Sequence, residues 1–176
     1  AEADNLVLRA ARMMDATDVA LVLDKCLPVA SGIGGGSADA AATLRLLQRM
    51  TGQSLPPMTQ VLRLGADVPV CLAGRPARMT GIGEVVTPLP PLPPLACVLV
   101  NPRLPVPTPL VFAQMASRQN PPLPDLPSHV LASAEALCGW LVANSRNDLV
   151  TAAREVAPIL TDVQAALDGT RDCLFA

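Results

Sequence analysis

Three consecutive glycines, Gly34 to Gly36, lie between an apolar run and a stretch rich in Ala and Leu, and this position suits them to chemistry. Glycine has no Cβ, so the backbone can come close to a ligand. The N–H groups at the start of a helix, together with the helix dipole, favour a bound anion. Residues 31–37 therefore predict a loop that binds phosphate at the start of a helix.

Two widespread phosphate loops do not fit this pattern. A Walker A loop has Gly-Lys-Ser/Thr after its glycines, and the one lysine, Lys25, lies before them. The dinucleotide fingerprint has an acidic residue about 20 positions further on, and no Asp or Glu lies between Asp39 and Asp67. A tightly packed glycine turn without a ligand stays open as an alternative.

Two polar side chains beside the glycines each allow two interpretations. Ser37 either caps the helix or donates its hydroxyl to a phosphate or a metal-bound water. Asp39 either complements the helix dipole in the first turn or binds Mg²⁺ beside a nucleotide. We favour the helix-dipole interpretation for Asp39.

Asp67 is a carboxylate in an otherwise apolar run. Burying a carboxylate is unfavourable unless it is hydrogen-bonded, paired or retained for function. A catalytic role and a turn or helix cap are both compatible with the local sequence.

The elements that position these residues follow from periodicity and from helix-ending residues. The first half predicts helices at 5–14, 38–50 (ending at Gly52) and 58–64, a strand at 19–23, and two extended segments at 68–73 and 77–87 that pair as a hairpin. Residues 88–94 form a stiff proline-rich connector. The second half predicts a strand at 95–100 and helices at 109–115, 132–142 and 148–167, the last broken at Pro158.

Composition excludes several classes of function. The net charge of −2 and the aromatic content of 2% argue against a nucleic-acid surface. The longest uncharged stretch, residues 85–102, holds too many prolines for a membrane helix. The five cysteines form no C-x-x-C pair, so we expect small buried side chains rather than a disulfide framework or zinc site. With no secretory signal at the start, the expected location is the cytoplasm.

Residues 28–41 resemble the phosphate-binding motif of the GHMP small-molecule kinases, whose distinctive element is the triple glycine. Within that superfamily, residues 64–69 and 81–84 are similar to the kinases whose acceptor is diphosphocytidyl methylerythritol, in the methylerythritol phosphate route to isoprenoid precursors. The resemblance continues in order through 4–6, 87–89, 101–102, 107–109 and 147–149.

This resemblance implies ATP and Mg²⁺ as cofactors and a role for each matching residue. Asp67 matches the aspartate that stands beside the acceptor hydroxyl, as a base or as a group that orients the nucleophile. Ile82 and Thr108 match positions that line the acceptor pocket. Ala38 replaces a serine common in the motif. The implied ATP-binding residues are Pro28, Val29, Ala30, Ser31, Gly32, Ile33, Gly34, Gly35, Gly36, Ser37 and Ala38. No metal ligand is assigned.

The resemblance also implies an α+β fold with the GHMP-kinase two-subdomain architecture and an active cleft between the subdomains. Residues 1–92 match the N-terminal, nucleotide-binding domain without its first strands, and residues 93–176 match an incomplete C-terminal domain. The family's catalytic lysine precedes the region of Asp4, so we expect neither it nor the closing glycine-serine loop here, and the fragment alone is expected to be inactive. Lys25 matches a different position.

The expected function is ATP-dependent phosphorylation of a small-molecule hydroxyl, without nucleic-acid or membrane partners. Another GHMP kinase acting on a different alcohol is the first alternative. A nucleotide-binding module without catalysis is the second. A purely structural protein would have little use for three glycines at a helix start.

Overall fold

The structure, a computed structural model, describes residues 4–26 and 32–170. Contacts divide the chain into two compact units, Ala1–Pro91 and Leu92–Ala176, and the division falls within the proline-rich connector. The first unit combines helices with a two-stranded sheet, and the described elements of the second are helical, so the fold is α+β. The assignment of residues 1–92 and 93–176 to the two kinase domains stays a prediction.

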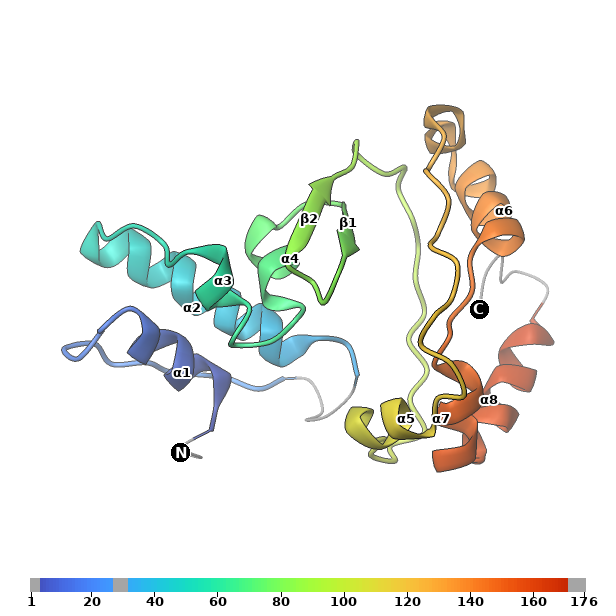
Figure 1. The fold of residues 1–176 in the computed structure, drawn as a ribbon, viewed down its shortest axis with the longest axis horizontal. Coiled ribbons are helices and arrows are strands. Elements are labelled where there is room, and N and C mark those ends of the chain that lie inside the picture. Colours follow the sequence, from blue (N-terminus) through green and yellow to red (C-terminus); the bar gives the residue numbers. More distant parts are fainter. Residues whose placement is uncertain (1–3, 27–31, 171–176) are drawn as a thin grey trace. The chain divides into compact units, whose positions relative to one another are not determined.

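The first unit is built around the long helix α2 (Gly35–Thr51), against which α1 (Leu6–Met13) and α4 (Val68–Ala73) pack (Figure 1). The shortest helix of the unit, α3 (Met58–Val61), follows α2. A core of small and medium apolar side chains joins α1, α2 and α4. The largest fully buried side chains include Leu44, Leu47 and Val68. Burial of these side chains gives the unit most of its stability.

Local signals in the sequence set the helix ends. The Asn5 side chain accepts a hydrogen bond from Val7 N (2.9 Å) and caps α1. Gly52 ends α2 in the left-handed conformation at φ 72°, with its N–H donating to Gln48 O (2.9 Å). These ends confirm the predicted helix near 5–14 and the stop at Gly52. The start of α2 differs, because the helix includes Gly35, Gly36 and Ser37.

The predicted hairpin between 68–73 and 77–87 is wrong. Residues 68–73 form α4, which has Pro69 in its first turn and the left-handed Gly74 (φ 62°) at its end, both typical of helix boundaries. A run of six apolar residues does not distinguish a helix from a strand. The hairpin instead forms within the second segment, where β1 (Ala77–Thr80) pairs antiparallel with β2 (Val85–Pro88) and Thr80 faces Val85.

Two predicted strands do not form, and one predicted helix is shorter than expected. Residues 19–23 and 95–100 were predicted to be strands, yet both are extended without pairing to any described strand. Strand structure requires ladder hydrogen bonds to a neighbour, and apolar composition does not supply that neighbour. Their side chains are largely exposed, with Val22 at 96% and Val98 at 81%. The helix predicted at 58–64 ends at Val61 and continues as a turn.

The second unit contains four α-helices and one 3₁₀ turn among its described residues. The elements are α5 (Thr108–Gln114), η1 (Ser128–Ala132), α6 (Ala134–Asn144), α7 (Val150–Val156) and α8 (Ile159–Asp168). α5 packs against α7, and η1 packs against α6. The Ser133 hydroxyl accepts from Ala136 N (3.2 Å) and caps α6. The break between α7 and α8 lies at Ala157 and Pro158, which confirms the predicted interruption.

Two other sequence expectations can be compared with the described residues. Cys26 and Cys97 are exposed and Cys71 and Cys138 are half-buried, so the expectation of buried cysteines is wrong for these four. None of the helices in the described part of the chain is both long and apolar enough to span a membrane.

Candidate active site

The described part of the glycine segment turns sharply into α2. Gly32 (φ 76°) and Gly34 (φ 72°) adopt the left-handed conformation, and Gly34 is the N-cap of α2. Among the described residues, a Cβ at either position would meet no atom within 4 Å, so it is the backbone conformation that favours glycine here. Of the predicted ATP-binding residues, Pro28, Val29, Ala30 and Ser31 lie outside the described residues.

The first turn of α2 presents backbone N–H groups. The first hydrogen bond of the helix runs from Ala38 N to Gly34 O (3.0 Å), so the N–H groups of Gly35, Gly36 and Ser37 have no partner within the helix. The helix has 17 residues, and its dipole places partial positive charge at this end. Such an arrangement can bind an anionic oxygen.

Because α2 begins at Gly35, the capping role considered for Ser37 and the first-turn position expected for Asp39 are both wrong. Ser37 is the third residue of α2 and does not cap it, because Gly34 holds the N-cap position. Asp39 is the fifth residue and therefore lies beyond the first turn. Its carboxylate instead pairs with the Lys25 ammonium.

The Lys25–Asp39 pair was not foreseen from the sequence, although opposite charges on either side of the glycines were a usable signal. The Lys25 side chain is 42% exposed and that of Asp39 is 30% exposed. An ion pair at this exposure contributes at most about 1 kcal/mol to stability. Its effect is to connect the chain before the glycines to α2 beyond them.

α1 contacts the same end of α2. A Cβ at Gly36 would lie 3.3 Å from Leu6 Cδ1, which is tighter than an ordinary van der Waals contact. Gly36 therefore allows the start of α1 to pack closely against the first turn of α2. This contact places the 4–6 segment beside the glycines.

Asp67 lies at the N-cap position of α4, with its side chain exposed rather than buried. Its carboxylate makes no capping hydrogen bond, so the cap interpretation holds for the backbone position only. Burial raises the pKa of the Cys71 thiol, and the negative charge of Asp67 raises it further. The positive charge of Arg45 lowers it by a smaller amount. The raised pKa makes Cys71 a poor thiolate nucleophile.

Backbone contacts gather three sequence-predicted residues in the first unit. A Cβ at Gly65 would lie 3.8 Å from Ser37 Oγ, so the segment before Asp67 adjoins the start of α2. The turn between β1 and β2 approaches the same segment, since a Cβ at Gly83 would come 2.3 Å from Ala66 O. Ile82, on this turn, is 73% exposed. Ser37, Asp67 and Ile82 thus lie on adjoining segments.

Thr108, Ile33 and Ala38 are further predicted site residues that the structure describes. Thr108 is the first residue of α5 in the second unit and is exposed. Ile33 is 42% exposed, and Ala38 is exposed on α2. Across residues 4–26 and 32–170, no group of three or more His, Cys, Asp or Glu is arranged to hold a metal ion.

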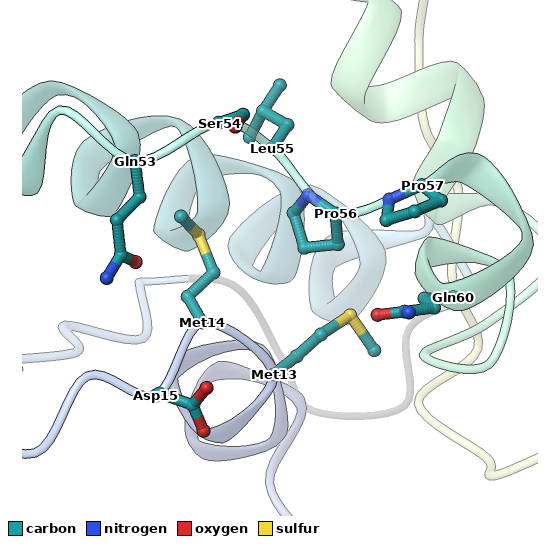
Figure 2. A pocket seen from close by; sticks show the side chains of 9 residues that line it. All are labelled: Met13, Met14, Asp15, Gln53, Ser54, Leu55, Pro56, Pro57 and Gln60. Carbon is teal, nitrogen blue, oxygen red and sulfur yellow. The ribbon is translucent and has the colours of Figure 1, made fainter.

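A pocket of about 410 Å³ lies at the other end of α2. In Figure 2, Met13 and Met14 at the end of α1 lie across from Gln53, Leu55 and Pro56, which follow α2. The 17 residues of α2 separate this pocket from the glycines by roughly 25 Å. None of the sequence-predicted site residues lines it.

Comparison with known proteins links this geometry to a family. Residues 5–81 match the family described as GHMP kinases N terminal domain. The chain is 54% identical over 175 residues to a 4-diphosphocytidyl-2-C-methyl-D-erythritol kinase from Cereibacter sphaeroides, covering 98% of this chain and 62% of that protein. A kinase with the same name from Ruegeria pomeroyi is 53% identical, covering 95% of this chain and 60% of its own length.

A solved structure shows the same relationship in three dimensions. A crystal structure of 4-(cytidine 5'-diphospho)-2C-methyl-D-erythritol kinase matches with a TM-score of 0.72 at 34% identity, covering 93% of this chain and 61% of that one. The chain thus spans about three fifths of the length of the curated relatives it matches.

Proposed function

We propose that this chain, whose residues 5–81 match the N-terminal domain of the GHMP kinases, forms part of an enzyme that phosphorylates 4-diphosphocytidyl-2-C-methyl-D-erythritol with ATP. The observation that carries the proposal is identity of about one half, over nearly the whole chain, to relatives with that name. The reaction belongs to the methylerythritol phosphate route to isoprenoid precursors. We place it in the cytoplasm.

In this proposal the first turn of α2 binds the phosphates of ATP. The N–H groups of Gly35, Gly36 and Ser37 are available at the positive end of a 17-residue helix. No atom of the described residues would come within 4 Å of a Cβ at Gly32 or Gly34, which supports close approach of a nucleotide to this backbone. Mg²⁺ would neutralise charge on the phosphates, held mainly by their oxygens. The Ser37 hydroxyl, a hard oxygen ligand, fits that role, whereas the Asp39 carboxylate is already paired with Lys25.

Asp67 is proposed to orient or deprotonate the acceptor hydroxyl. The hydroxyl oxygen forms a bond to the γ-phosphorus, the bond to the bridging oxygen of ADP breaks, and the hydroxyl proton passes to the Asp67 carboxylate. Such transfer depends mainly on positioning and on stabilising charge. The exposure of Asp67 and its lack of a capping bond leave its carboxylate available. Ile82 and Thr108 are proposed to contact the acceptor.

Substitution of Asp67 in the intact protein tests this role. Asp67→Asn keeps the shape of the side chain and removes its capacity to take a proton, so we expect kcat to fall by about 10²-fold or more. The dissociation constant for ATP is expected to change by less than about threefold, because the phosphates are bound at α2. Asp162→Asn, an acidic residue in the first turn of α8, is the matched control and should leave kcat unchanged.

The identity of the acceptor is tested separately, by competition. Cytidine diphosphate is expected to inhibit competitively against the acceptor, since the proposed pocket binds that part of the molecule. If cytidine diphosphate does not compete with the acceptor while other nucleoside diphosphates inhibit, the result would favour a GHMP kinase that phosphorylates a different alcohol.

Near-normal turnover by Asp67→Asn would remove Asp67 from the mechanism.

A further inference from the structure

The turn between β1 and β2 touches the backbone immediately before Asp67. We propose that Gly83 and Glu84 of this turn are positioning residues for Asp67. They act without contacting substrate, by fixing the backbone from which the carboxylate projects. The inference rests on the proposed function, because it concerns the reaction in which Asp67 is proposed to act.

The carboxylate of Asp67 depends on its backbone for its position. Among the described residues no hydrogen bond or ion pair holds this side chain. The backbone around it is fixed, with Val68 N donating to Gly65 O and Cys71 N donating to Asp67 O, both at 3.1 Å. Whatever moves residues 65–67 therefore moves the carboxylate.

Gly83 is the point at which the turn meets this segment. It is buried although its neighbours Ile82 and Glu84 are exposed, and its φ of 104° is one that other residues rarely adopt. A Cβ here would lie 2.3 Å from Ala66 O and 3.0 Å from Ala66 C. These neighbours are backbone atoms and cannot rotate aside as a side chain would. The two backbones are therefore in direct contact, and only glycine fits at the contact.

Glu84 fixes the shape of the turn that carries Gly83. Its carboxylate Oε2 accepts a hydrogen bond from Ile82 N at 2.6 Å. The same carboxylate covers Gly81, where a Cβ would lie 2.1 Å from Glu84 Oε1. A charged acceptor on a backbone N–H makes a stronger bond than a neutral one. The turn is thereby closed by its own last residue.

The segment before Asp67 also contacts the first turn of α2. A Cβ at Gly65 would lie 3.8 Å from Ser37 Oγ and 3.6 Å from Val68 Cγ2. Residues 65–67 therefore adjoin both the first turn of α2 and the turn of the hairpin. This arrangement fixes Asp67 relative to the helix start that is proposed to bind phosphate.

Gly83→Ala in the intact enzyme is the first test. The added methyl group must displace the backbone of Ala66, so we expect kcat to fall by at least about tenfold, since a misplacement of about 1 Å can lower rate by 10²-fold. The KM for ATP should change by less than about threefold. Gly52→Ala is the matched control, because Gly52 is also left-handed (φ 72°) but has open space around it. It should lower stability and leave kcat unchanged.

The two substitutions of Glu84 provide an independent test that does not strain the backbone. Glu84→Ala removes the acceptor for Ile82 N and is expected to lower kcat severalfold, whereas Glu84→Gln retains an acceptor oxygen and should restore most of it. This rescue distinguishes positioning from a need for negative charge. Circular dichroism verifies that each variant is folded, and if Gly83→Ala is unfolded the Glu84 pair decides.

The outcomes separate this inference from the function on which it rests. Wild-type protein that releases no ADP with the acceptor overturns the proposed function and this inference with it. Active wild type, with kcat unchanged in folded Gly83→Ala and in Glu84→Ala, overturns the positioning role alone. A fall in kcat at constant KM for ATP, with rescue by Glu84→Gln, supports it.

Discussion

Truncation of Leu44 measures how strongly the first unit depends on the core around α2. The Leu44 side chain is fully buried, in the cluster that joins α1, α2 and α4. Leu44→Ala removes three carbon atoms, which at about 0.8 kcal/mol per buried methylene is roughly 2.4 kcal/mol of transfer free energy. The cavity left behind adds to this loss, and the expected total is about 3 kcal/mol.

Leu46 provides the matched control on the same helix. It lies two residues from Leu44, but it is 53% exposed and outside the core cluster. Leu46→Ala removes the same atoms and leaves no closed cavity, so the expected loss is roughly 1 kcal/mol or less. The two variants differ in burial and not in chemistry.

Urea unfolding followed by circular dichroism is the assay. For an m-value of about 2 kcal/mol/M, the Leu44→Ala midpoint should fall by roughly 1.5 M, and the midpoint of Leu46→Ala by less than about 0.5 M. The slope should not change, because neither substitution alters the extent of unfolding. Equal shifts for the two variants would refute the assignment of Leu44 to the core.

Two further predictions concern titrating groups. Burial and the charge of Asp67 raise the pKa of Cys71, so iodoacetamide should modify Cys71 more slowly than the exposed Cys97, as measured by mass spectrometry. Equal rates of modification would contradict a raised pKa for Cys71. The contribution of this group to folding stability is present at pH values below the ordinary pKa of a thiol, and it is lost as the pH rises through the raised pKa. Hydrogen bonds from the backbone N–H of Glu135 and, to a smaller extent, from the Ser133 hydroxyl lower the pKa of the Glu135 carboxyl. The ionised carboxylate therefore stabilises the folded state at pH values above its ordinary pKa, and this contribution is lost as the pH falls through the lowered pKa. Ser133→Ala should return the pKa of Glu135 toward its ordinary value in an NMR titration and destabilise α6 by about 1 kcal/mol; an unchanged titration would remove the hydroxyl as a cause.

Helix positions were predictable where a single residue determines the backbone. Gly52 ends α2 because glycine tolerates φ of 72°, and Pro158 interrupts the last helical stretch because it fixes its own φ and lacks an N–H. Both signals act locally. The start of α2 was placed too late because Gly35 and Gly36 are weak helix formers, and propensity alone does not identify them as helical.

Strands were not predictable from the same local evidence. Residues 95–100 have the composition of a strand, but a strand exists only where another segment pairs with it. Residues 68–73 have a similar composition and form a helix, because Pro69 and Gly74 suit its two ends. Pairing partners are a property of the tertiary fold and not of the segment.

The residues of the candidate site were chosen from the sequence one by one, and their roles stay predictions; how they are arranged could not be predicted. The glycines and Asp67 were singled out by residue type and by resemblance, whereas the exposure of Asp67 and the pairing of Lys25 with Asp39 depend on the three-dimensional fold. The contact of Gly83 with Ala66 also joins segments distant in sequence. The Gly-x-Gly spacing at 81–83 was its one signal in the sequence.

Acceptor-dependent ADP release is the most direct test of the central claim. The intact protein is supplied with ATP, Mg²⁺ and 4-diphosphocytidyl-2-C-methyl-D-erythritol, and ADP and the phosphorylated acceptor are measured together. We predict that the two products form in equal amounts, that neither forms without acceptor, and that Asp67→Asn abolishes most of both. A folded protein that binds ATP yet releases no ADP in the presence of this acceptor would contradict the account.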